Sequence, residues 1–412
     1  MQTPLFDIPF SRLRDLLVSL GEPKFRAAQL YHAVLHSNAR SAANVTTLPV
    51  SSRTAIDSAF SFRAGRVLKE SIAADGVTKQ LVEFSGARER ADEGGVVGLG
   101  LKEKNQGAGA VPRVVESVRI PEGRRVTLCV SSQAGCSLAC SFCHTGTQKL
   151  LGNLTSSEII EQVLLSGPTR PTNVVFMGMG EPLLNYRNVH RAISVLTSKD
   201  GFAMPARRIL ISTAGVSPII PQLAADLPGV RLALSLHAPT DELRTRLMGV
   251  NARFPLKDTL SACAKFVDVS LASLGDSVTA RDEVSDDEED EEKESPRGQF
   301  FNGTRRVRVS FEYVLLHNVN DAPSDAVALA QLLHGWHPRA RLHALVNLIP
   351  FNAWPDAPFV PPPRSNVIAF AETLRAAGFR VTVRRARGSD VLGACGQLKA
   401  SAQKRVPTRA SA

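Results

Sequence analysis

Three cysteines within eight residues are the part of this sequence best suited to chemistry. Cys136, Cys140 and Cys143 are separated by three and then two residues, so their thiolates can surround one soft metal centre. A structural zinc ion normally takes four protein ligands, and the nearest further donors are Cys129 and His144. A [4Fe-4S] cluster also usually takes four cysteines, so three would leave one iron open to bind and split a substrate. The spacing indicates an iron–sulfur cluster with an open iron, and the alternative is a zinc loop or three unrelated buried thiols.

Another cysteine, Cys395, stands alone near the end of the sequence, between Ala394 and Gly396. Arginines shortly before it favour the thiolate form of its side chain, and a reachable thiolate is a nucleophile. The ordinary alternative is a buried structural cysteine, which is what we expect of Cys263 on its apolar helical pattern. Six cysteines in 412 residues are too few for a disulfide framework.

An alternation of strand and helix patterns must position these residues. We expect strands at 126–131, 173–177, 208–212, 231–236, 307–315 and 342–349. We expect helices at 156–165, 189–197, 219–223, 256–266 and 324–334, then a last helix and strand at 366–376 and 379–384. Such an alternation is typical of a parallel sheet covered by helices, either a barrel or a doubly wound sheet. Chemistry in these folds lies at the carboxyl ends of the strands.

Glycines and short polar side chains follow several of the expected strands. The segment after the second strand contains Gly180 and Glu181, where a ligand can approach the backbone closely and a carboxylate can accept hydrogen bonds from an amine. Later strands are followed by Ser212, Ser235, Leu236, His237 and Asn352. One such residue alone is weak evidence, whereas five strand ends, counting the one that leads into the cysteine loop, indicate a shared site.

Composition divides the chain into a core, two insertions and two terminal units. Residues 1–85 contain helical patterns at 10–20 and 25–35 and a strand pattern at 77–84, which predict a small N-terminal accessory domain. Residues 86–112 are rich in Gly, Glu and Arg, which indicates a flexible insertion. The core spans 113–385, with an acidic, disordered insertion expected at 272–305, and residues 386–412 form a tail that carries Cys395.

The charge of the chain favours a polyanionic partner. The net charge is +10, but the run 282–294 holds ten acidic residues and one lysine, so the rest of the chain carries +19. A folded body this basic favours nucleic acid as the binding partner. No stretch of eighteen apolar residues occurs, and the first residues show neither a signal nor a transit pattern. We therefore expect a soluble protein without membrane contact in a reducing compartment, the cytoplasm, with an organelle as the alternative.

Together these motifs resemble the RlmN-type adenine-C2 RNA methyltransferases, which are radical S-adenosylmethionine (SAM) enzymes. The resemblance covers the chain except the two insertions and the last few residues. It rests on the cysteine loop with its preceding strand, on an N-terminal helical stretch and on the strand ends and tail, at 20–29, 127–143, 178–183, 212–213, 235–239 and 394–398. It implies an α/β fold in which a radical-SAM partial (β/α)6 barrel carries a small N-terminal helical domain that binds RNA.

The resemblance implies two cofactors, a [4Fe-4S] cluster and SAM. Cys136, Cys140 and Cys143 would hold the cluster, whose open iron binds SAM. The family's SAM contacts match Gly180, Glu181, Ser212, Ser235, Leu236, His237 and Asn352.

The resemblance further implies a methyl-carrying cysteine. One SAM would methylate Cys395, and a radical made from a second SAM would remove hydrogen from that S-methyl group, which then adds to carbon 2 of adenine. Glu116 would take the ring proton, and Cys129 would release the product by forming a disulfide with Cys395. The implied partners are RNA (23S rRNA, with tRNA as a second candidate) and an electron donor such as flavodoxin or ferredoxin, with the protein acting as a monomer.

Three other functions fit part of the pattern. A Cfr-type enzyme that methylates carbon 8 of the same adenine shares nearly all these motifs. A methylthiotransferase would need a second cysteine triad, which the sequence lacks. A zinc-dependent RNA-binding protein without catalysis would need only the metal loop and the basic surface.

Overall fold

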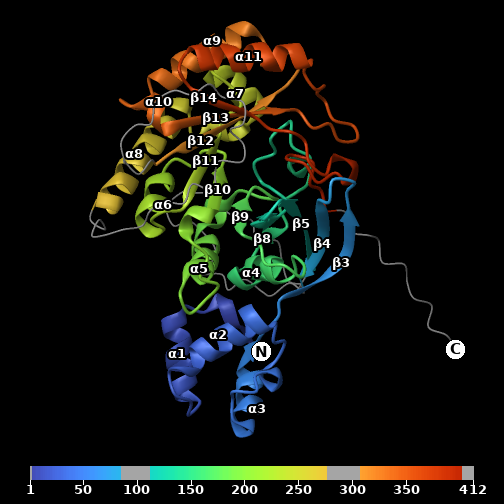
Figure 1. Ribbon diagram of the computed structural model, residues 1–412, viewed down its shortest axis with the longest axis vertical. Helices are drawn as coiled ribbons and strands as arrows, with labels where there is room; N and C mark the ends of the chain where they lie inside the picture. Colours follow the sequence, from blue (N-terminus) through green and yellow to red (C-terminus); the bar gives the residue numbers. More distant parts are fainter. Residues whose placement is uncertain (1, 85–111, 276–306, 401–412) are drawn as a thin grey trace, which may run out of the picture.

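A single sheet of ten strands organises the molecule. The computed structural model describes residues 2–84, 112–275 and 307–400. Within them the strand order of the sheet is β14-β13-β12-β11-β10-β9-β6-β5-β4-β3. Helices cover the parallel part of the sheet, and three N-terminal helices form a separate lobe below it (Figure 1).

The parallel part of the sheet confirms the expected strand–helix alternation. Its strands run in the order of the sequence and pair in parallel from β6 to β14. Their bounds are β6 Arg125–Cys129, β9 Asn173–Phe176, β10 Ile209–Thr213, β11 Arg231–Ser235, β12 Val309–Leu315, β13 Ala344–Pro350 and β14 Arg380–Val383. Each was predicted to within about three residues, because buried parallel strands form compact apolar runs. All their carboxyl ends therefore lie along one edge of the sheet.

The helices between these strands are amphipathic and bury their apolar faces against the sheet. They are α4 Ser156–Leu164, α5 Tyr186–Thr197, α6 Ile220–Asp226, α7 Asp241–Leu247, α8 Leu256–Gly275, α9 Pro323–His334, α10 Ala340–His343 and α11 Arg364–Ala376. Thr155 and Glu158 form a capping box at the start of α4, each accepting a hydrogen bond from the other's backbone amide. Cys263 is fully buried in α8, which confirms its expected place in the core.

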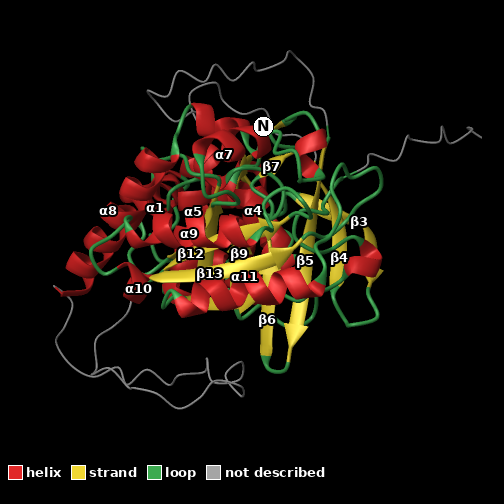
Figure 2. Cartoon of the chain, turned by 90° about the horizontal axis from the view of Figure 1, so that it is seen from above, coloured by secondary structure: helices red, strands yellow, loops and turns green. Residues whose placement is uncertain are grey.

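Three antiparallel strands extend the sheet beyond β6. They are β3 Gly65–Ile72, β4 Thr78–Phe84 and β5 Arg113–Glu122, and β5 pairs with β6. Seen from above, they lie at the side of the molecule away from most helices (Figure 2). The strand β4 was predicted, whereas β3 and β5 were not. The N-terminal unit predicted to span 1–85 therefore contributes two strands to the main sheet.

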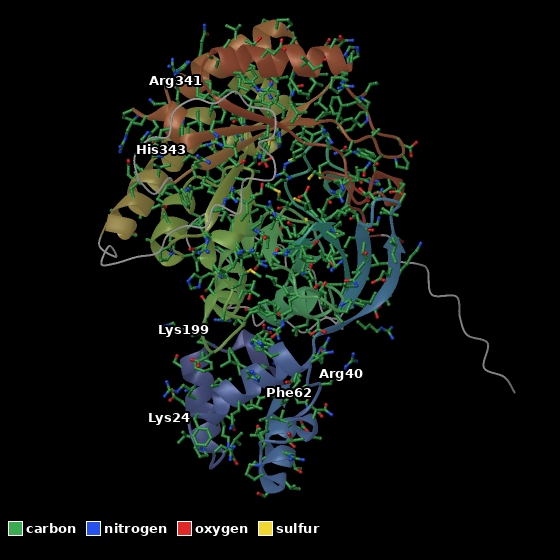
Figure 3. All side chains as sticks on the ribbon, in the orientation of Figure 1. Lys24, Arg40, Phe62, Lys199, Arg341 and His343 are labelled. Atoms are coloured by element: carbon green, nitrogen blue, oxygen red, sulfur yellow. The ribbon has the colours of Figure 1, made fainter. Side chains whose placement is uncertain are left out.

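The N-terminal lobe consists of α1 Phe10–Ser19, α2 Arg26–Ser37 and α3 Val50–Ala59. It is tied to the body near α4 and α5. The amide of Ser157 donates to Asp7 at 2.7 Å, and Arg191 donates to the carbonyl of Asp7 at 2.7 Å. Figure 3 shows Lys24 and Arg40 on this lobe.

Both predicted insertions lie almost entirely outside the described residues, at 85–111 and 276–306. In the part of the chain that is described, no helix is long and apolar enough to cross a membrane.

Candidate active site

The cysteine loop lies directly beyond the carboxyl end of β6. Backbone hydrogen bonds fold it tightly, from the amide of Cys143 to the carbonyl of Cys140 at 3.1 Å and from Gly146 to Cys143 at 2.9 Å. A Cβ on Gly146 would lie 2.6 Å from the carbonyl oxygen of Cys140, so only glycine fits there. The loop brings Cys136, Cys140 and Cys143 close enough for their thiols to influence one another, and their role as cluster ligands stays a prediction.

The three thiols suit a metal cluster that would share their charge. Burial raises the pKa of Cys136 to about 12 and raises those of Cys140 and Cys143, and the neighbouring thiols raise the first two further. Bonding to iron removes this cost, because coordinated cysteines are deprotonated. Among residues 2–84, 112–275 and 307–400, no three His, Cys, Asp or Glu side chains converge closely enough to ligate a single ion. A cubane takes one thiolate on each iron, so its ligands stand further apart than those of zinc.

A second loop, after β9, lies against the start of the cysteine loop. Gly180 has φ +96°, and a Cβ there would lie 2.4 Å from the Cβ of Gln133. The adjoining Glu181 is buried, and its carboxylate accepts hydrogen bonds from the amides of Leu183 at 3.0 Å and Ala214 at 2.7 Å. Burial raises the pKa of Glu181 to about 7. The loop thus fixes a carboxylate between the ends of β9 and β10.

The ends of β10, β11 and β12 bring the next predicted residues together. The hydroxyls of Ser212 and Ser235 are 3.5 Å apart. His237 is buried with φ +59°, accepts a hydrogen bond from the amide of Val314 at 3.0 Å and packs edge-on against Phe142 of the cysteine loop.

The side chain of Leu236 behaves differently from those of its neighbours. It is fully buried in the core, and only its backbone groups lie near this edge.

A buried arginine that sequence reasoning missed holds this edge together. Arg244 of α7 donates to the carbonyls of Ala214 at 2.7 Å, Ser235 at 3.0 Å and Leu236 at 3.0 Å. Burial lowers the pKa of its guanidinium to about 10. Its position in an unpredicted short helix gave no signal of this role in the sequence.

The C-terminal tail closes the site from the other side. Asn352, after β13, donates to the carbonyl of Cys395 at 3.2 Å. The amide of His144 donates to the carbonyl of Gly396 at 2.8 Å, and the hydroxyl of Thr145 donates to that of Leu398 at 2.6 Å.

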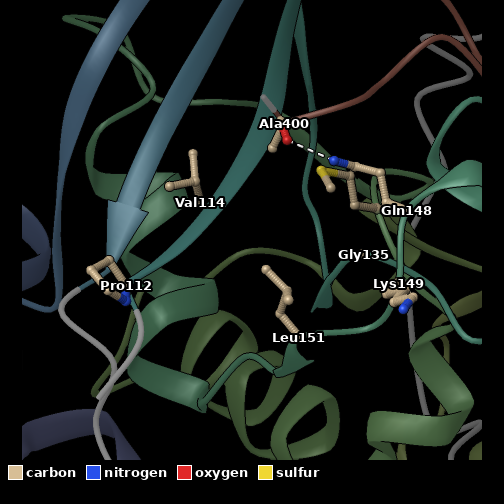
Figure 4. A pocket seen from close by; sticks show the side chains of 8 residues that line it. Pro112, Val114, Gly135, Gln148, Lys149, Leu151 and Ala400 are labelled. Atoms are coloured by element: carbon tan, nitrogen blue, oxygen red, sulfur yellow. Dashed lines mark hydrogen bonds between the residues drawn. The ribbon is translucent and has the colours of Figure 1, made fainter. Parts of the chain in front are cut away.

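The same tail is anchored at both ends. Gln148 donates to the carbonyl of Ala400 at 2.6 Å, as Figure 4 shows. At the other end, Arg387 pairs with Asp75 at 2.8 Å. The hollow in Figure 4, of about 60 Å³, is too small for a nucleobase.

The two predicted reaction cysteines are neighbours across the tail. Cys129, at the end of β6, is buried, whereas Cys395 is exposed. Burial, and then the charge of Cys395, raises the pKa of Cys129 to about 12. All six cysteines of the chain are free thiols, so the predicted disulfide between Cys129 and Cys395 is not present in this structure.

Arg384 stands beside both thiols. Its Nε is 3.7 Å from Oε2 of Glu312, whose other oxygen accepts hydrogen bonds from Ser310 and Asn347 at 2.8 Å. The Glu312 carboxylate and then the sulfurs of Cys395 and Cys129 raise the pKa of Arg384, although its burial opposes this. The sequence signal was the arginine run before Cys395, which did not distinguish one arginine from the next.

Glu116 of β5 approaches the C-terminal tail from the antiparallel part of the sheet. It is buried, and its carboxylate pairs with the ammonium of Lys79 at 3.0 Å. Its other oxygen accepts a hydrogen bond from the amide of Lys399 at 2.9 Å. The predicted base is therefore held by β4 and by the tail, and Lys79 is a further residue that sequence reasoning missed.

Comparisons with known proteins found similar sequences and a similar structure. Residues 130–290 match the model of the Radical SAM superfamily. The chain is 36% identical to a protein of Methylocella silvestris named dual-specificity RNA methyltransferase RlmN, over 95% of this chain and 89% of that protein. A protein of the same name from Rhodospirillum rubrum is 37% identical over 93% of this chain and 77% of that protein. The crystal structure of a radical SAM methyltransferase from Sphaerobacter thermophilus is 33% identical, has a TM-score of 0.77 and covers 96% of this chain and 99% of that one.

Proposed function

The chain belongs to the RlmN family of radical SAM RNA methyltransferases, and from that premise we propose that it methylates carbon 2 of an adenine in 23S rRNA and in tRNA. Two observations support this most: Cys395 is close enough to Cys129 to raise its pKa, and Lys399, four residues beyond Cys395, donates its backbone amide to Glu116. The three proposed reaction residues come from the tail, from β6 and from β5.

The cofactors are proposed from the residues that would hold them. Cys136, Cys140 and Cys143 would bind a [4Fe-4S] cluster, and the predicted SAM contacts line the strand ends beside it. When bound, the two would supply a methyl group and a 5′-deoxyadenosyl radical. Radical chemistry from these two cofactors is required because carbon 2 of adenine is electron-poor and does not attack SAM as a nucleophile.

Side chains of the protein would carry out the remaining steps of the reaction. The exposed sulfur of Cys395 would accept a methyl group and carry its carbon to the adenine, which must leave its stack to reach it. Glu116 would take the proton from carbon 2, since it is the carboxylate fixed beside the tail. Cys129 would then bond to the sulfur of Cys395 as the bond from that sulfur to the transferred carbon breaks.

Two finer predictions belong to this proposal. The electron donor would be a small protein such as flavodoxin or ferredoxin, and the enzyme would act as a monomer. RNA as the substrate class agrees with the net charge of +10.

The test is mass spectrometry of nucleosides from unmodified rRNA and tRNA. The RNA is incubated anaerobically with cluster-reconstituted protein, SAM and a reductant. We expect 2-methyladenosine, and the RNA that carries it identifies the substrate. A peak of 8-methyladenosine would instead assign the Cfr-type reaction, and no methylated adenine from protein with an intact cluster would contradict both.

A further inference from the structure

A groove lies between α11 and the ends of β13 and β14. It has a volume of about 1040 Å³, which is ample for a nucleotide-sized group. One wall is the stripe of α11 that contains Arg364 and Arg375, which are eleven residues apart and so fall on one face of the helix. The opposite wall is formed by Arg384 and Arg385, at the end of β14.

The groove is strongly cationic. Four arginines line it, and none of its lining residues among those described is an Asp or Glu. Arg364, Arg375 and Arg385 are exposed, and within the described chain these three guanidiniums make one hydrogen bond, from Arg375 to the carbonyl of Val381 at 3.3 Å. Guanidiniums bind phosphate oxygens in a planar, two-point geometry, so open arginines facing each other suit phosphodiesters.

The floor of the groove is apolar. The side chains of Ile368 and Val383 are 46% and 38% exposed, although both are large and hydrophobic. Apolar surface between cations suits a sugar or base whose phosphates lie at the rim. From Arg364 to Arg375 the helix rises about 16 Å, enough for more than one nucleotide.

The groove opens at the candidate active site. Asn352 lines it and also donates to the carbonyl of Cys395. Arg384 lines it and lies beside the sulfurs of Cys395 and Cys129. A strand that delivers one base to Cys395 therefore has its adjoining backbone at the mouth of the groove.

We propose that this groove binds the phosphodiester backbone of the RNA next to the target adenosine. The assignment rests on the proposed function, because it takes RNA as the substrate. An acidic electron-donor protein is the rival occupant. The recessed shape, the apolar floor and the opening at Cys395 rather than at the cysteine loop favour the nucleic acid.

The test compares the variant Arg364→Gln/Arg375→Gln with wild type. Arg341→Gln is the matched control, because Arg341 of α10 is also exposed but does not line the groove (Figure 3). The probe is a fluorescein-labelled RNA hairpin with an unpaired adenosine, and its Kd is measured by anisotropy over a range of salt concentrations. Melting temperature and cluster absorbance check that all three proteins are equally folded.

We expect the double variant to raise Kd about tenfold. The slope of log Kd against log salt should become shallower by about 1.4, since each single-strand phosphate contact contributes about 0.7. The control should match wild type in both. An unchanged Kd and slope in the double variant would overturn the proposal, and so would slower turnover with flavodoxin as donor but not with dithionite.

Failure of the groove and failure of the proposed function can be told apart. If the wild-type protein methylates adenine while the double variant keeps the wild-type Kd, only the proposal that the groove binds RNA is overturned. If the wild-type protein binds the hairpin through the groove but methylates no adenine, only the proposed methylation reaction is overturned.

Discussion

The carboxylate of Glu116 accepts a hydrogen bond of 2.9 Å from the backbone amide of Lys399, four residues beyond Cys395. Its other oxygen pairs with Lys79 at 3.0 Å. The proposed base is therefore fixed to the segment that carries the proposed methyl carrier.

Glu116→Gln should remove the base and keep one of its two contacts, because the glutamine amide has a single acceptor oxygen where the carboxylate accepts from both Lys79 and Lys399. We expect the yield of methylated adenine per minute to fall by about 10² to 10⁴. Methylation of Cys395 by SAM without RNA, measured by mass spectrometry of the tryptic peptide, should continue at the wild-type rate. Loss of both steps together would assign Glu116 a structural role.

Cys395→Ala should abolish RNA methylation and keep the cluster, because Cys395 is not part of the cysteine loop. The measurement pairs nucleoside mass spectrometry with iron analysis and visible absorption of the anaerobic protein. Wild-type cluster content with residual turnover would rule out Cys395 as the methyl carrier.

Cys129→Ala should trap the enzyme on its RNA. Without the second thiol, nothing breaks the bond from Cys395 to the base, so a covalent protein–RNA species should accumulate on a denaturing gel. Cys263→Ala is the matched control, since that thiol is also buried but belongs to α8, in the hydrophobic core. Free product and no adduct from the Cys129 variant would contradict the assignment.

Arg384→Gln should slow methylation of Cys395 by about tenfold, because a cation beside the sulfur stabilises the thiolate that must attack. It also leaves the buried carboxylate of Glu312 without its cation, which should cost about 1–3 kcal/mol in the free energy of unfolding. Arg384→Lys should restore the rate in large part. Equal rates in wild type and both variants would confine Arg384 to a packing role.

His237 should make the stability of the apoprotein sensitive to acid. Burial, and then the charge of Arg244, lowers its pKa to about 3, against about 6.5 in an unfolded chain. The unfolded state then binds the proton more tightly, so stability is fully present above pH 6.5 and is lost as pH falls toward 3. Between pH 7 and pH 5, wild type should lose about 2 kcal/mol more than His237→Asn, measured by urea unfolding. Parallel curves for the two proteins would contradict this.

Much of the fold could be predicted because its signals are local. Parallel strands buried on both faces form short apolar runs, and the capping box of α4 is visible as Thr155 and Glu158. Since all parallel strands end at one edge, the residues after them could be grouped without any contact being known. Ser212 and Ser235, 23 positions apart, meet in this way.

The rest could not be predicted because it depends on contacts between distant segments. Arg244 looks like any surface arginine in a short helix, yet it is fully buried and holds three carbonyls. Nothing local to Lys79 indicates that it pairs with Glu116. The strand β5 borders the expected insertion at 86–112, and its place between β4 and β6 is set by pairing with both.

The hydrogen bonds between the tail and the cysteine loop have a consequence for folding during synthesis on the ribosome. Thr145 and its partner Leu398 are 253 residues apart, and the partner of Gln148 is Ala400. A ribosome adds about 5–20 residues each second, so residues 398–400 are synthesised on the order of tens of seconds after the loop. Until residue 400 has left the ribosome exit tunnel, one side of the metal-binding loop lacks the segment that covers it. Messenger RNA cut short in its last codons would therefore yield chains with an intact sheet and an open, oxygen-accessible loop.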